Sequence, residues 1–268
     1  MIFDTHAHYD DERFDEDRDS LLADLKAHGV SAVINVGASM DGSSRSVALS
    51  KQYPFVYAAV GVHPDDCRRF GEEELAKLRE LAQEKKVLAI GEIGLDYAFF
   101  GEMSDEEIAE EKAAQKECFR KQLMLARELH MPVFIHSRDA AEDTMQLMRE
   151  HTKLQTGCPM GIIHCYAYSV EMAKEYTAMG YLLGIGGVLT FKNARKLPDV
   201  VTEIPLDYLV LETDSPYLAP VPFRGERNDS TKLSYVVAKI AELKGITEEE
   251  VLRVTEANAR KLIRNVEQ

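Results

Sequence analysis

Apolar residues gather in eight short runs along the chain, and the stretches between these runs have helical spacing. The runs are MIFDTHAH, SAVINVG, FVYAAVGV, VLAIGEIG, PVFIHS, GIIHC, YLLGIGG and YLVLETD. Short apolar runs of this kind indicate strands, and strands that alternate with helices predict β/α units and a parallel sheet.

The predicted helices lie between these strands, at residues 18–28, 72–84, 111–130, 140–151 and 170–179. Ser104 and Thr247 each precede a glutamate by three positions, which is the spacing of a capping box at a helix start. Gly29 and Gly180 follow predicted helix ends, where glycine is favoured.

Two more helices, at residues 232–244 and 248–263, are predicted after the last strand. Their apolar positions form one face, which we expect to pack on the sheet. Eight strands in 268 residues favour a closed barrel over an open sheet, because such barrels typically contain about 250 residues. The predicted fold is α/β: a (β/α)8 TIM barrel with two additional C-terminal helices, and residues 1–268 as a single domain.

The composition indicates a soluble protein of a reducing compartment. The four cysteines, Cys67, Cys118, Cys158 and Cys165, are too few for a disulfide framework and form no Cys-x-x-Cys pair. The N-terminus lacks the basic and apolar segments of a signal peptide, and the apolar runs are shorter than the roughly 18 residues of a membrane span. We expect a cytoplasmic protein without membrane contact, with a monomer as the working expectation.

The chain carries 32 basic and 46 acidic residues, for a net charge of −14. This charge argues against a protein that coats nucleic acid through a basic surface. It allows an enzyme that binds one or two phosphates through metal ions, because a bound cation reverses the local field. The chain has neither a dinucleotide fingerprint nor a P-loop, which disfavours redox and nucleotide-triphosphate enzymes.

Candidate chemistry begins with His6 and His8 in the first apolar run. Residues i and i+2 of a strand point to the same face, so both imidazoles project to one side and can ligate a single ion. A hydrogen-bonded pair of core histidines is the other interpretation of this spacing.

Further ionisable residues stand at the ends of later strands. Glu92 ends the fourth run, His136 the fifth and His164 the sixth, while Glu212 and Asp214 end the eighth on one face by parity. The C-terminal rim of a β/α barrel is where such enzymes carry catalytic groups. Ionisable core residues are costly unless they are paired or bind metal, so their convergence on one rim predicts a metal site.

The number of ligands predicts two divalent ions, because six side chains exceed the three that hold a mononuclear catalytic zinc. We expect His6, His8 and Asp214 on one ion, His136 and His164 on the other, and Glu92 between them. Mixed imidazole and carboxylate ligation suits Mg, Mn or Zn. Asp214 and Glu92 are the candidate catalytic carboxylates, Asp214 as the group that moves the proton of the bridging water. We expect Glu212 to contact a metal ligand on the side away from the ion and so to orient that ligand.

Seven motifs occur in order from Phe3 to Pro220: FDTHAH, GVHP, GEIGLDY, PVFIHSRDA, HCY, TFKNA and LVLETDSPYLAP. Together they resemble the TatD family of metal-dependent hydrolases, within the amidohydrolase-like barrel superfamily. The resemblance implies metal-dependent deoxyribonuclease activity, with 3′→5′ exonuclease activity in some members. It also matches the six ligands to the family's metal positions, and His63 to a position near the substrate phosphate.

Two loops depart from the family pattern. Ala-Tyr at 167–168 stands where members often have Ser-Gly, and the segment at 227–230 lacks the proline of the common RN-x-P. Basic candidates for phosphate contact follow the seventh and eighth strands, with plain surface as the other interpretation. They are Lys192, Arg224 and Arg227. Cys165 has the opposite parity to His164, so we expect it to pack and not to react.

We expect a hydrolase that cleaves phosphodiester bonds of DNA, in a single strand or at a strand end, with a metal-bound hydroxide. One alternative keeps the metals and hydrolyses an amide, ester or lactone of a small molecule. Many superfamily barrels of that kind bridge their ions with a carbamylated lysine, and Glu92 occupies that place here. A second alternative is a metal-bearing interaction protein, for which a site closed at four ligands would be expected.

Overall fold

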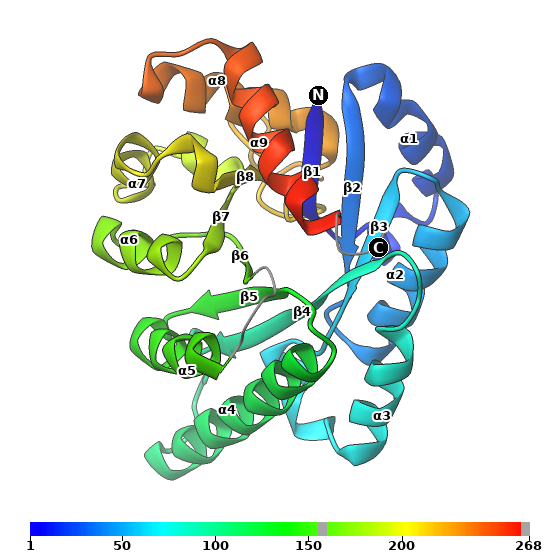
Figure 1. The fold of residues 1–268 in the computed structure, drawn as a ribbon, viewed down its shortest axis with the longest axis vertical. Helices are drawn as coiled ribbons and strands as arrows, with labels where there is room; N and C mark the ends of the chain where they lie inside the picture. Colours follow the sequence, from blue (N-terminus) through cyan, green and yellow to red (C-terminus); the bar gives the residue numbers. More distant parts are fainter. Residues whose placement is uncertain (155–159, 264–268) are drawn as a thin grey trace.

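Eight parallel strands close into a barrel with helices around its outside (Figure 1). The computed structural model describes residues 1–154 and 160–263, so Cys158 lies outside the described residues. The strands are β1 (Ile2–Ala7), β2 (Val30–Val36), β3 (Val56–Val60), β4 (Val87–Asp96), β5 (Val133–Arg138), β6 (Gly161–Ile163), β7 (Tyr181–Ile185) and β8 (Leu209–Leu211). Each strand pairs with the next, and β8 pairs with β1 through Leu211 and Asp4. The predicted (β/α)8 barrel is confirmed.

The helices also follow the predicted alternation. They are α1 (Arg18–Asp24), α2 (Met40–Gln52), α3 (Glu72–Leu81), α4 (Asp105–Glu128), α5 (Ala141–Leu154), α6 (Val170–Ala178), α7 (Leu197–Glu203), α8 (Leu233–Lys244) and α9 (Glu248–Ile263). The two C-terminal helices α8 and α9 are confirmed. In the described part of the chain, no helix is both long and apolar enough to cross a bilayer.

Helix α4 begins earlier than the predicted residue 111. Its N-cap is Ser104, whose hydroxyl accepts from the Glu107 backbone N–H while the Glu107 carboxylate accepts from the Ser104 N–H at 2.8 Å. The capping box at Ser104 is therefore confirmed, and it starts the same long helix. The acidic residues after it lie beside the positive end of the helix dipole, which stabilises them there.

Helix α2 was absent from the helices predicted by periodicity, and its inner face explains why. Three of its buried residues are the serines Ser43, Ser46 and Ser50, while Val47 and Leu49 are its buried large apolar residues. The hydroxyl of Ser43 donates to the Gly61 carbonyl at 2.9 Å, and the amide of Asn35 donates to the Ser46 hydroxyl at 2.8 Å. A helix buried partly through hydroxyl groups shows an interrupted apolar stripe in its sequence.

Side chains from all eight strands fill the inside of the barrel. This inner cluster includes Phe3, Ile34, Ala59, Leu88, Phe134, Ile162, Leu182 and Val210. Leu262 and Ile263 of α9 join it, so this helix covers one end of the barrel (Figure 1). The Met1 amino group lies 2.8 Å from Glu256 of α9, which places the covered end at the N-terminal side of β1. The opposite, C-terminal end is left for a site.

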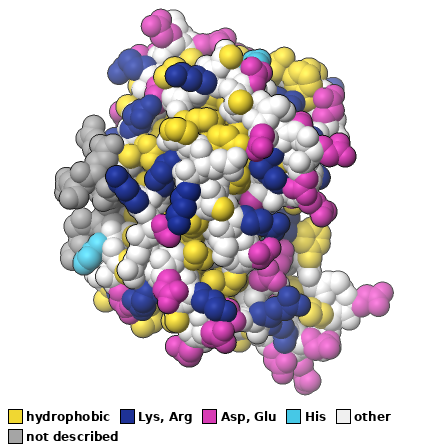
Figure 2. All heavy atoms as spheres, turned by 90° about the vertical axis from the view of Figure 1, so that its right-hand side faces the viewer, with side chains coloured by type: hydrophobic (Ala, Val, Ile, Leu, Met, Phe, Trp, Pro, Cys, Tyr) yellow, Lys and Arg dark blue, Asp and Glu magenta, His cyan; other side chains and the backbone are white. Residues whose placement is uncertain are grey.

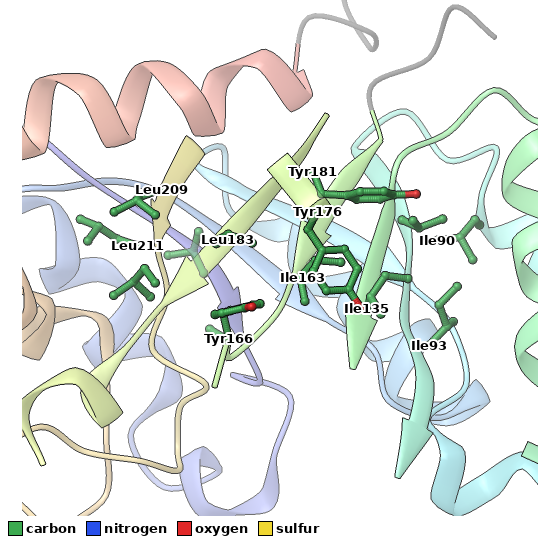
Figure 3. Packing of buried hydrophobic residues seen from close by; sticks show 14 of the residues in the cluster. Ile90, Ile93, Ile135, Ile163, Tyr166, Tyr176, Tyr181, Leu183, Leu209 and Leu211 are labelled. Carbon is green, nitrogen blue, oxygen red and sulfur yellow. The ribbon is translucent and has the colours of Figure 1, made fainter. Parts of the chain in front are cut away.

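A larger apolar cluster packs the outer faces of the strands against the helices. Figure 3 shows Ile135, Ile163 and Leu183 from neighbouring strands beside Tyr176 and Tyr181. These side chains are almost completely excluded from solvent. Packing on both faces of the strands makes the wall of the barrel a rigid support for side chains at its rim.

We predict that Leu183→Ala lowers the free energy of unfolding by about 2–5 kcal/mol, because it removes a fully buried side chain and leaves a cavity. Urea denaturation followed by circular dichroism measures the change. Leu154→Ala is the matched control: Leu154 is 63% exposed, so its loss is expected to change stability by less than about 0.5 kcal/mol. Equal effects of the two substitutions would contradict the outer cluster as a major source of stability.

Candidate metal centre

Six ionisable side chains meet at the C-terminal end of the barrel. They come from β1, β4 and β5 and from the segments that follow β1, β6 and β8. The six are His6, His8, Glu92, His136, His164 and Asp214. These are the side chains that the sequence predicted to converge.

His6 and His8 face each other with their Nε2 atoms 3.2 Å apart. The Nδ1 of His8 lies 2.7 Å from the Val36 carbonyl, which can only accept, so Nδ1 carries a proton and Nε2 is the nitrogen that faces the centre. His6 is buried, and its Nδ1 has no hydrogen-bond partner among the described residues. Because both Nε2 atoms face the same point, the two imidazoles can bind one shared cation.

The sequence analysis expected Glu92 at the end of the fourth strand. In the structure Glu92 lies in the middle of β4, because the strand continues to Asp96. Its Oε1 is 2.9 Å from Nδ1 of His136 and 3.7 Å from Nε2 of His164. Its Oε2 is 3.6 Å from Nε2 of His6 and 3.7 Å from Nε2 of His8. The two oxygens of one carboxylate therefore face two different pairs of histidines.

Asp214 lies beyond β8, which ends at Leu211, so strand parity does not place its side chain as predicted. Its backbone is left-handed, with φ of 57°, a conformation that aspartate tolerates better than most residues. The Asp214 N–H donates to the His6 carbonyl at 2.9 Å. Its Oδ1 lies 3.4 Å from Nε2 of His8 and 3.6 Å from Nε2 of His164.

Glu212 stands behind His164. Its Oε1 lies 3.1 Å from Nδ1 of His164 and accepts the Cys165 N–H at 2.6 Å. Gly184 makes room for this carboxylate, since a Cβ there would lie 1.9 Å from Oε2 of Glu212. Burial and the charge of Glu212 raise the pKa of the Cys165 thiol well above its ordinary value, so this cysteine stays protonated at neutral pH.

The spacing of the ligand atoms fits bound cations. Ligands about 2.0–2.2 Å from an ion lie about 3.0–3.5 Å from their neighbours in tetrahedral or octahedral geometry. Three groups of possible ligands occur among the described residues: His6 with His8 and Asp214, His63 with Glu92 and His136, and His6 with His164 and Glu212. The first is the group predicted for one ion. In the second, His63 accompanies His136, while His164 lies between Asp214 and Glu92.

The carboxylates of the cluster favour positive charge on His8 and His136. Burial lowers the pKa of His8, but the hydrogen bond to Asp214 and the charge of Glu92 outweigh it and raise the pKa to about 10. The pKa of His136 is raised to about 9 against burial by Asp96 and Glu92. Burial and neighbouring His164 lower the pKa of His6 to about 4. The pKa of Glu92 is held well below its ordinary value by His136 and His6, despite burial.

Asp96 orients His136, a role that the sequence analysis missed. Its Oδ2 lies 3.0 Å from Nε2 of His136 and 2.6 Å from Nη2 of Arg138. The contact turns Nδ1 of His136 towards Glu92 and leaves it for a metal. The alternation of side chains along a strand could have predicted this role: Asp96 follows Glu92 by four positions in β4, so both side chains are expected on the same face.

Asp4, also missed, fixes the segment that carries Asp214. This carboxylate is completely buried and accepts from the Thr213 N–H at 3.0 Å, the Thr213 hydroxyl at 2.7 Å and the Ser230 hydroxyl at 2.6 Å. Burial raises the pKa of Asp4 to about 7, against these hydrogen bonds. The first strand thereby holds the loop after the last one.

A cavity of about 660 Å³ opens over the cluster. His63 lines it, with its ring centroid 4.3 Å from that of His136, and Arg45 and Arg138 line it as well. The other basic residues predicted to contact substrate are not among its described lining. Arg227 forms a two-point ion pair with Asp17, Arg224 packs 3.9 Å over the ring of Phe191, and Lys192 is exposed. A substrate role for these three residues stays a prediction.

Comparisons with known proteins agree with this geometry. Residues 3–264 match the family described as TatD related DNase. The chain is 43% identical to the uncharacterized metal-dependent hydrolase YabD of Bacillus subtilis (98% of this chain, 99% of that protein). It is 34% identical to the 3′-5′ ssDNA/RNA exonuclease TatD of Cronobacter sakazakii (97% of each). The crystal structure of YjjV, a TatD homolog from Escherichia coli K12, superposes with a TM-score of 0.87 at 29% identity (97% of each chain). The chain thus belongs to the family of TatD related DNases and is a metal-dependent hydrolase.

Proposed function

We propose that this chain is an exonuclease that holds two divalent ions and removes nucleotides from the 3′ end of single-stranded DNA. The barrel and its two C-terminal helices would act as one domain, a monomer in the cytoplasm. Mg, Mn and Zn are the candidate ions, since the donors are imidazoles and carboxylates. The name of the Cronobacter relative, a 3′-5′ ssDNA/RNA exonuclease, supports the substrate and the polarity.

One observation carries the proposal: Glu92 faces His136 and His164 with one oxygen, and His6 and His8 with the other. A carboxylate in that position suits a bridge between two cations. Two ions held by these residues would neutralise the charge of a phosphodiester and lower the pKa of water. The open cavity above leaves coordination positions for substrate, whereas a structural site is closed by protein ligands.

The chain's own groups supply positioning and proton transfer. The Asp214 carboxylate, beside His8 and His164, is placed to accept the proton of the attacking water. Asp96 keeps the His136 ring in its orientation, and Glu212 does so for His164. His63 and Arg138 line the cavity beside His136, where they are placed to contact a phosphate.

The surface charge suits an enzyme that binds a strand end and not a long tract of duplex. Figure 2 shows Lys and Arg side chains interspersed with Asp and Glu over the face that it presents. The net charge of −14 repels a polyanion at long range, so affinity has to come from local contacts at the cavity.

The rival activity, hydrolysis of an amide, ester or lactone of a small molecule, uses the same ions. A carbamylated lysine bridges the ions in many such barrels, and Glu92 takes that position here. Among the described residues that line the cavity there is no lysine. This supports the phosphodiester over the small-molecule substrate.

We predict that the metal-stripped protein, once Mg²⁺, Mn²⁺ or Zn²⁺ is added, shortens 5′-end-labelled single-stranded DNA stepwise from its 3′ end. The same labelled strand with a blocked 3′ end should stay intact. His136→Ala should lower the rate at least about 100-fold, because a ligand of the ions is lost. His28→Ala, an exposed histidine at a helix end, is the matched control and should retain full activity. Gel analysis of the labelled products gives the rates, and cooperative thermal unfolding of each variant verifies the fold. A wild-type rate for His136→Ala would refute its assignment as a ligand.

We predict that Asp96→Asn raises the metal concentration needed for half-maximal activity about 10- to 100-fold, because it weakens the group that orients His136. Activity measured across a metal titration tests this, with kcat at saturating metal as the second readout. Asp143→Asn, which disrupts an ion pair with Lys116 outside the site, should leave the titration unchanged. An unshifted titration for Asp96→Asn would exclude Asp96 as a positioning residue.

We predict that added divalent metal raises the midpoint of thermal unfolding of the stripped protein, since an ion that binds only the folded state stabilises it by about 2.7 kcal/mol at 100 times its Kd. Differential scanning fluorimetry measures the shift. The double variant His6→Ala/Asp214→Ala removes two ligands of one group and keeps His63, Glu92 and His136, so it should show a clearly smaller shift. If the wild-type protein and the double variant shift equally, the ion binds elsewhere.

A further inference from the structure

Tyr217 is a half-exposed aromatic residue in the wall of the cavity over the metal centre. It is 47% exposed, and its ring centroid lies 6.5 Å from that of His8. Its N–H donates to the Asp214 carbonyl at 2.8 Å, so a single tight turn joins the ring to a candidate ligand. The mechanism proposed above gives this side chain no role.

Arg13 braces one face of the ring. Its guanidinium carbon lies 4.1 Å from the Tyr217 ring centroid, and the side chain is held by Asp11 through two hydrogen bonds of 3.0 Å. The Tyr217 hydroxyl lies 3.5 Å from Asp11 Oδ2, at the limit of a hydrogen bond. Because Arg13 covers one face, a base that enters the cavity can stack only on the other face of the ring. A fixed aromatic ring with a free face is a stacking surface.

The charges of the cavity separate a phosphate from an uncharged group. Asp10, Asp11 and Glu12 line the cavity on the side of β1 and β8, where Tyr217 lies. Two arginines accompany them: Arg45 lies 4.0 Å from Asp10, and Arg13 is paired with Asp11. Arg138 lines it on the side of β5, across the closed barrel from β1 and β8. Beside Tyr217 the three carboxylates outnumber the two arginines, so a phosphate is less favoured there than at the metal centre, where bound cations would attract it. The part of a nucleotide that fits against Tyr217 is therefore its base, which is planar and uncharged.

We propose that Tyr217, braced by Arg13, stacks the base of the nucleotide whose phosphate lies at the metal centre. This inference rests on the proposed nuclease function and adds a base-binding position to it. Every base has a π-face, so the contact tolerates any sequence. It also requires an unpaired, unstacked base, which gives a physical reason for preferring single strands over duplex.

The test compares a normal 3′-terminal nucleotide with one whose base is absent, in a single-stranded DNA substrate. We expect Tyr217→Ala to lower kcat/KM for the normal terminus about 5- to 100-fold, the range that base–aromatic stacking contributes. On the abasic terminus the variant and the wild-type protein should be equal. Tyr217→Phe keeps the ring and should stay within about twofold of wild type. Tyr208→Ala is the matched control. Tyr208 is a partly exposed tyrosine just before β8, at the other end of the barrel, so its substitution should leave kcat/KM unchanged for both substrates.

A binding measurement separates this inference from the proposed function. The deoxynucleoside 5′-monophosphate of 2-aminopurine has no phosphodiester bond to cleave, and its fluorescence is quenched when the base stacks. With metal present, we expect quenching by the wild-type protein and by Tyr217→Phe, and little by Tyr217→Ala. Quenching that depends on Tyr217 in a protein that cleaves no DNA would sustain the base position and reject the nuclease. Equal loss of activity on both termini for Tyr217→Ala, or no quenching by a wild-type protein that cleaves DNA, would overturn the inference alone.

Discussion

The balance of charge at the mouth of the barrel is the constraint on which the other features depend. Glu92 and Asp214 lie within 3.7 Å of nitrogens from four imidazoles, of which His6 and His164 are buried and His8 and His136 are partly exposed. Buried carboxylates are stable only when positive charge is close, whether it comes from protons on histidines or from metal ions. The neighbouring carboxylates raise the pKa of His8 and of His136, so protons on these two rings can meet this need when metal is absent. Metal binding and proton release at this site are therefore coupled.

That constraint also explains the groups around the ligands. His8 is tied to the Val36 carbonyl, His136 to Asp96 and His164 to Glu212, so each ring has one nitrogen engaged and the other directed at the centre. The rigid wall of the barrel holds these partners at fixed separations. His6 differs, because its Nδ1 has no partner among the described residues. Its orientation depends on packing, including the ring of His164 stacked 3.5 Å away.

The strands and the six converging side chains were predictable because each leaves a local signal. An apolar run followed by a ligand residue is visible within eight positions, as in PVFIHS. The rest depends on partners far along the chain. Asp96 acquires its role from His136, 40 positions later, and Asp4 from Thr213 and Ser230, more than 200 positions later. Helix α2 escaped prediction because serines form much of its buried face and interrupt the apolar pattern.

The metal centre is built from both ends of the chain. His6 and His8 belong to the first strand region, and Asp214 follows the last strand, with its N–H bonded to the His6 carbonyl. Asp4 adds a second connection to the segment before Asp214. During synthesis on the ribosome, a nascent chain therefore carries the early ligands long before the group that completes the site exists. The six ligands come together only when the barrel closes, so incomplete translation products and proteolytic fragments that lack either His6 and His8 or Asp214 lack part of the metal centre.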